Sequence, residues 1–118
     1  MKFYLLALMM IPLCLSSTAQ KLRTGIYTFD YCDLEYPLCL GPCKVVIKGD
    51  SISIYATKEL AQRITFTKEG DLIDRGIILK HKTGKWIVGK SVKDANTNEI
   101  GYDGPAIIDF KKRQYWTY

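Results

Sequence analysis

The sequence has few of the side chains that most often carry catalysis or bind transition metals. One of its 118 residues is a histidine, His81, and all three methionines lie within the first ten positions. A single imidazole cannot build a multi-histidine metal site, and the chain beyond residue 10 has no thioether to offer copper. The G-x-S-x-G elbow of serine hydrolases is also missing. We therefore expect no cofactor.

Long apolar runs are also scarce, because only residues 3–15 form one. This run follows Lys2 and precedes Ser17 and Ala19, which occupy positions −3 and −1 of a cut before Gln20. A positive start, a short apolar run and small residues at these positions are typical of a secretory signal peptide. The sequence thus predicts a signal peptide over residues 1–19, cleaved near Ala19 and Gln20.

Export has three further consequences. Residues 20–118 are expected to form a single small β domain that is secreted or lies in the periplasm or cell envelope. No transmembrane anchor is expected after cleavage, because no later apolar segment is long enough to span a bilayer. Cleavage also removes Cys14 and leaves Cys32, Cys39 and Cys43.

Positive charge is in excess but is not concentrated. The formal net charge is +5, and basic residues alternate with acidic ones, as at Lys58 beside Glu59 and Lys93 beside Asp94. Nucleic-acid binders usually gather positive charge on one stripe together with stacking aromatics. No nucleic-acid partner is expected.

Alternating apolar and polar residues predict a β hairpin over residues 44–55. If Gly49 and Asp50 form a two-residue type II′ turn, Ile47 lies opposite Ile52 and Val45 lies opposite Ile54. These four apolar side chains then share one face, as in a half-buried hairpin.

Four other segments continue this pattern. Residues 25–29 predict a strand, and residues 63–73 predict a hairpin with Phe66 and Ile73 as apolar partners. Residues 76–90 predict a hairpin around Thr83 and Gly84, with Leu79 facing Val88 and His81 facing Trp86. Residues 106–118 predict a last hairpin, with 107–110 and 115–118 as its strands. Thr57 can cap one short helix over residues 58–62.

The predicted fold class is all-β: a small antiparallel meander that forms a barrel or a sandwich, with at most one short helix. Gly25, Ile26 and Tyr27 resemble the Gly-x-aromatic element that opens lipocalin-like barrels, with Tyr27 where tryptophan is usual. This resemblance covers three residues. It favours a barrel over a sandwich and implies no ligand.

Residues 30–43 and 94–105 are expected to be irregular loops. The first holds the three remaining cysteines, and the second is rich in Asn, Asp and Gly. In an exported chain we expect one disulfide and one free thiol, so the bond is Cys32–Cys39, Cys32–Cys43 or Cys39–Cys43. The alternative is a zinc site of Cys32, Cys39, Cys43 and His81, which oxidation of the thiols disfavours.

The predicted function is that of an exported, non-catalytic binding module. Its partner would be a protein, an envelope component or a small ligand. Exposed loops on a β scaffold are common binding sites, and the candidate residues in these two loops are Tyr31, Tyr36, Leu38, Tyr102 and Asp103. One alternative is a small secreted enzyme that uses a cysteine with His81, or paired acids such as Asp71 and Asp74. Another is an inhibitor or a structural envelope protein.

Overall fold

The predicted central hairpin forms two adjacent strands, β2 (Leu38–Lys48) and β3 (Ser51–Ala56). Val45 pairs with Ile54 and Ile47 pairs with Ile52, as the alternation predicts. All four side chains are buried. The turn begins at Gly49, whose φ of 61° fits the first central position of a type II′ turn.

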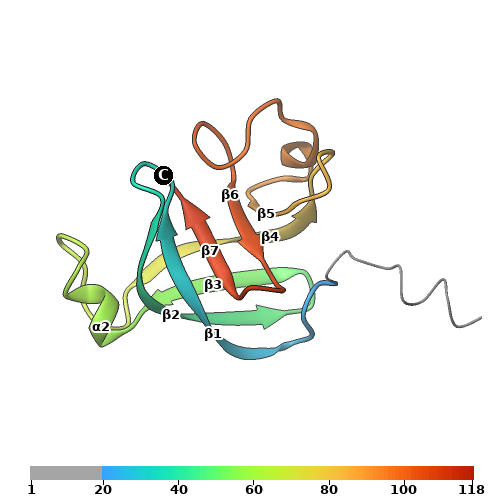
Figure 1. Cartoon of the computed structure of the whole chain (residues 1–118). Helices are drawn as coiled ribbons and strands as arrows, with labels where there is room; N and C mark the ends of the chain where they lie inside the picture. Colours follow the sequence, from blue (N-terminus) through green and yellow to red (C-terminus); the bar gives the residue numbers. More distant parts are fainter. Residues whose placement is uncertain (1–19) are drawn as a thin grey trace, which may run out of the picture.

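A computed structural model describes residues 20–118, in which seven strands pair in chain order and close into a barrel (Figure 1). The other strands are β1 (Gly25–Asp33), β4 (Leu72–Lys80), β5 (Trp86–Gly89), β6 (Ala106–Asp109) and β7 (Gln114–Thr117). Neighbours are antiparallel except β1 and β7, which run parallel and close the barrel. The fold is therefore an all-β barrel and not a sandwich. The predicted signal peptide lies outside the described residues.

An apolar core fills the side of the sheet that faces the barrel axis. Its buried members include Phe29, Val45, Ile47, Ile52, Ile54, Ile78, Val88, Ile108, Phe110 and Tyr115. Each fully buried side chain of this size contributes about 1.5–3 kcal/mol by leaving water. The core therefore specifies which residues of each strand point outward, and these outward residues are available for a ligand.

The short helix is confirmed as α2 (Lys58–Ala61). The Thr57 hydroxyl oxygen accepts a hydrogen bond from the Leu60 backbone N–H at 3.2 Å and donates to the Pro42 carbonyl at 2.6 Å. Leu60 is fully buried against the core. This cap thus joins the helix to β2.

The prediction of an irregular loop over residues 30–43 is wrong. Strand β1 continues to Asp33, β2 begins at Leu38, and Cys32 pairs directly with Cys39 across them. Pro42 lacks an N–H to give to β1, and its partner Asp30 instead donates its own N–H to the Arg113 carbonyl at 2.8 Å. Pairing with β7 therefore supports the strand that the local sequence disfavours.

Two predicted hairpins also need correction. Residues 62–71 contain no strand, and Phe66 projects fully into solvent with a φ of 62°, so it does not face Ile73. In the β4–β5 hairpin the register differs by one residue, because Ile78 and not Leu79 pairs with Val88. The cause is a longer connection, closed by a hydrogen bond from His81 N–H to the Lys85 carbonyl at 2.8 Å.

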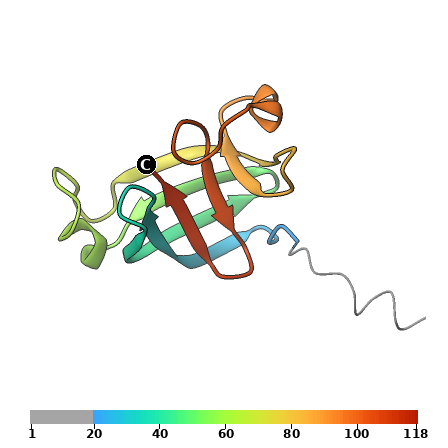
Figure 2. The same ribbon diagram turned by 45° about the horizontal axis from the view of Figure 1, so that its top comes forward.

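The last hairpin is confirmed as β6 and β7, which lie side by side (Figure 2). Ile108 pairs with Tyr115 in this hairpin. The connection from β5 to β6 contains the 3₁₀ helix η1 (Val92–Asn96) and is otherwise irregular, as predicted. The Asp94 carboxylate accepts the Lys90 backbone N–H at 2.6 Å and so holds the start of this connection. Among residues 20–118, no helix is long and apolar enough to cross a membrane.

Candidate functional site

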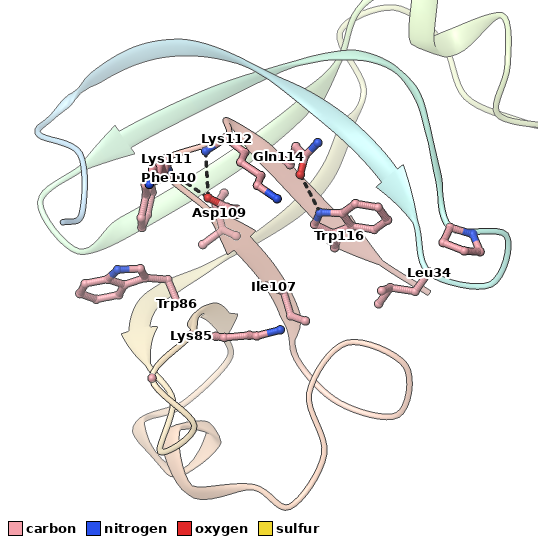
Figure 3. Close-up of a pocket in the computed structure, with 13 residues that line it drawn as sticks. Leu34, Lys85, Trp86, Ile107, Asp109, Phe110, Lys111, Lys112, Gln114 and Trp116 are labelled. Carbon is pink, nitrogen blue, oxygen red and sulfur yellow. Dashed lines mark hydrogen bonds between the residues drawn. The ribbon is translucent and has the colours of Figure 1, made fainter. Parts of the chain in front are cut away.

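The barrel wall opens where β5 and β6 stop pairing. These strands share two paired positions, Ile87 with Ile107 and Val88 with Ala106, and the pairing ends before Trp86 meets Ile108. A cavity of about 530 Å³ lies along this opening and the outer face of β6 and β7 (Figure 3). We call it the β5–β7 groove.

Apolar and aromatic side chains form most of the β5–β7 groove. They are Leu34, Pro37, Trp86, Ile107, Ile108, Phe110 and Trp116. Ile107 and Trp116 are a directly opposed pair of β6 and β7. Trp86 packs edge-on against Phe110, with ring centroids 5.8 Å apart. Both tryptophans of the chain therefore line this one groove.

The disulfide holds one wall of the groove. Cys32 and Cys39 are bonded, which selects the first of the three predicted pairings. The bond closes the β1–β2 hairpin, whose connection carries Leu34 and Pro37. The Leu34 backbone N–H also donates to the Thr117 carbonyl at 2.9 Å. This wall is thus attached to β7 by a hydrogen bond and restrained by a covalent link.

Positive charge lines the rim of the groove. Lys85, Lys111 and Lys112 contribute to its lining, and within residues 20–118 their ammonium groups form no ion pair or hydrogen bond. The nearby carboxylate of Asp109 accepts the backbone N–H groups of Lys111 and Lys112 at 3.0 and 2.9 Å. The Oδ1 atom of the carboxylate is therefore engaged by the turn.

None of the five predicted binding residues lines the groove. Tyr36 and Leu38 are exposed on the disulfide hairpin, whereas Tyr31 is half-buried with its ring centroid 5.6 Å from that of Tyr115. Asp103 is exposed beside Tyr102, whose ring contacts that of Tyr118 at a tilt of 38°, with centroids 4.0 Å apart.

The turn at residues 34–37 and the irregular loop that precedes β6 nevertheless meet beside the lining of the groove. Gly101 has a φ of 77°, and a Cβ added there would lie 2.7 Å from Leu34 Cδ1 and 3.1 Å from Ile107 Cδ1. Only glycine allows this approach of the second loop to the first. The sequence did not predict that the tryptophans and lysines of the groove form a site. The predicted pairing of residues 107–110 with 115–118 did, however, indicate that Ile107 and Trp116 lie on the same face of the hairpin.

A second cavity, of about 340 Å³, is lined by charged groups that already have hydrogen-bond or ion-pair partners within the protein. The buried Tyr115 hydroxyl donates to Asp74 Oδ2 at 2.6 Å, and Lys90 forms an ion pair with the same carboxylate. Burial, and next the Asp74 charge, raise the pKa of Tyr115 above its ordinary value. The Asp74 carboxylate therefore links β4 to β7 and to the residue that follows β5.

The structure does not bring the four residues of the zinc alternative together as a site. Cys32 and Cys39 are bonded to each other, and in the described part of the chain no three His, Cys, Asp or Glu side chains gather as metal ligands. Cys43 is free and buried, and burial raises its pKa to about 12. His81 is buried beside Thr83 and the Thr97 carbonyl, which lies 2.7 Å from Nε2.

Comparison with known proteins gives no relative for this chain. No protein-family model, curated protein or solved structure matches it.

Proposed function

We propose that this chain is an exported, non-catalytic binding module whose ligand occupies the β5–β7 groove. The observation that carries the proposal is the groove itself. Its volume of about 530 Å³ falls within the range of about 300–1,000 Å³ that small-molecule sites occupy. Its two tryptophans belong to the residue types that dominate binding energy at contact sites.

The placement of reactive groups supports binding over catalysis. A cysteine nucleophile needs a thiolate and a nearby base. The raised pKa of Cys43 keeps that thiol protonated at neutral pH, and Cys32 and Cys39 are held in the disulfide. Both ring nitrogens of His81 contact threonine oxygens. Of the suggested acid pair, Asp71 accepts the Lys68 N–H, and Asp74 is bound by Tyr115 and Lys90.

The groove can be tested with N-phenyl-1-naphthylamine, a neutral apolar probe. We expect its fluorescence to rise saturably with one probe per chain, and both indole N–H signals in the NMR spectrum to shift together. Trp116→Ala should weaken binding at least about five-fold, as expected for a residue that dominates a contact. Phe66→Ala removes a fully exposed aromatic ring outside the groove and should leave the affinity unchanged.

Two results would overturn the proposal. The probe could fail to bind the folded protein, or its NMR shifts could centre on Tyr36, Tyr102 and Tyr118. The second result would instead favour an interaction surface for a protein at the two loops. The shifts of the unmodified protein decide this point even if Trp116→Ala does not fold.

Export is tested by intact mass spectrometry of the protein expressed with its leader. We expect a chain that begins at Gln20 and is two mass units lighter than its reduced form, because one disulfide removes two hydrogens. Retention of Met1 in the exported protein would contradict cleavage.

A further inference from the structure

We infer that the ligand of the β5–β7 groove is an amphiphilic anion: a small molecule with an apolar body and one carboxylate. This inference rests on the proposed function, because it assigns a ligand class to the same site. It follows from which polar groups of the groove are already engaged and which remain for a ligand.

The floor offers few groups to a neutral polar ligand. The side-chain Oε1 of Gln114 accepts the Trp116 indole N–H at 3.2 Å, and Asp109 Oδ1 accepts two backbone N–H groups of the adjoining turn. Ile107 and Leu34 add apolar side chains to the same lining. A sugar would have to give up water without regaining enough hydrogen bonds, whereas a hydrocarbon body loses nothing by leaving water.

The rim of the groove, unlike its floor, carries positive charge that a ligand can reach. Lys85 extends over the floor toward Ile107 from the β5 side, and Lys112 extends from the turn between β6 and β7 (Figure 3). Neither ammonium group has an anionic partner within residues 20–118. A carboxylate at the rim would be opposite in charge to these lysines. It would bind them well, because charge-assisted hydrogen bonds to lysine are stronger than neutral ones. The apolar body would then lie against Trp116 and Ile107.

The test compares three ligands that share one apolar chain: dodecanoate, 1-dodecanol and dodecyltrimethylammonium. Tryptophan fluorescence reports binding directly, since both tryptophans line the groove, and all three are used below the concentrations at which they form micelles. We expect dodecanoate to bind about three-fold to ten-fold more tightly than dodecanol, and the cation to bind most weakly. Exposed ion pairs give a preference of this size. High salt should reduce the preference for dodecanoate.

Charge-removing variants assign the preference to the rim. Lys85→Gln with Lys112→Gln should lower dodecanoate affinity to that of dodecanol. The matched control, Lys58→Gln with Lys68→Gln, removes two exposed lysines outside the groove and should change neither affinity. A thermal unfolding transition like that of the unmodified protein shows that the rim variant is folded.

Three outcomes would overturn this inference, and they are distinguishable from failure of the proposed function. Equal affinity for dodecanoate and dodecanol would show an apolar groove without anion preference, and the proposed function would stand. Binding to phosphatidylglycerol vesicles without binding of monomeric dodecanoate would indicate a membrane surface as the partner. If none of the three ligands binds and N-phenyl-1-naphthylamine also fails, both proposals are wrong.

Discussion

Cys43 is the cysteine of residues 20–118 that stays outside the disulfide, and its environment predicts a pH effect. Burial raises its pKa from 9.0 to about 12. Its contribution to stability is complete below about pH 9, where folded and unfolded chains both keep the proton. Between about pH 9 and 12 the unfolded thiol ionises first, so the free energy of unfolding falls by up to about 1.4 kcal/mol per pH unit.

Urea unfolding measured from pH 8 to 11 checks this effect, with Cys43→Ala as the comparison. The variant should show a shallower loss of stability above pH 9. Tyr115, whose pKa burial raises, contributes to the slope in both proteins and cancels in the difference. Burial is the largest cause of the raised Tyr31 pKa, and the smaller part that the Cys43 charge causes is removed together with the thiol. Equal slopes would mean that the Cys43 thiol ionises as readily in the folded protein as in the unfolded chain.

The Tyr115 hydroxyl is a second polar group whose removal has a definite expected cost. It lies in the core and donates to Asp74, which Lys90 also contacts. Tyr115→Phe should lower the free energy of unfolding by about 1.5–3 kcal/mol, the usual value of a hydrogen bond to a charged group. Tyr55→Phe removes a partly exposed hydroxyl and should change stability by less than about 0.5 kcal/mol. Thermal unfolding of both variants tests the difference, and similar losses would contradict it.

At the scale of the element, the disulfide hairpin couples stability to the groove. Replacing both Cys32 and Cys39 with serine should cost about 2–3 kcal/mol, the value expected for a short closed loop. It should also weaken N-phenyl-1-naphthylamine binding, because Leu34 and Pro37 lose their restraint.

The matched control for the hairpin is Gly49→Ala. It strains a turn with a φ of 61° that lies outside the groove, so it should lower stability without changing probe affinity. If the serine variant binds the probe as well as the unmodified protein does, the hairpin wall is not part of the binding site.

The elements that could be predicted from sequence are those that local chemistry determines. The alternation around Gly49 gave the register of β2 and β3, and Thr57 marked the start of α2. The strand character of residues 30–33 could not be predicted locally, because it depends on β7, far away in sequence. The groove was missed for a similar reason, since it lies where β5 and β6 stop pairing after a long irregular connection.

For the whole molecule, the parallel pairing of β1 with β7 decides whether the sheet is a barrel. Strand β7 pairs with Asp30, Tyr31, Cys32 and Asp33 on one side and with β6 on the other. Without it, β1 and β6 would become open edges, and exposed edges favour aggregation. The core would also lose Tyr115, and the groove would lose Trp116.

A chain that ends at Arg113 tests this closure. We expect it to lose the cooperative thermal transition of the full chain and to aggregate, because both its core and its sheet are incomplete. A chain that lacks only Tyr118, an exposed residue beyond β7, should melt cooperatively within a few degrees of the full chain. A cooperative transition in the chain ending at Arg113 would show that six strands suffice. Closure by β7 would then serve the groove and not the stability of the barrel.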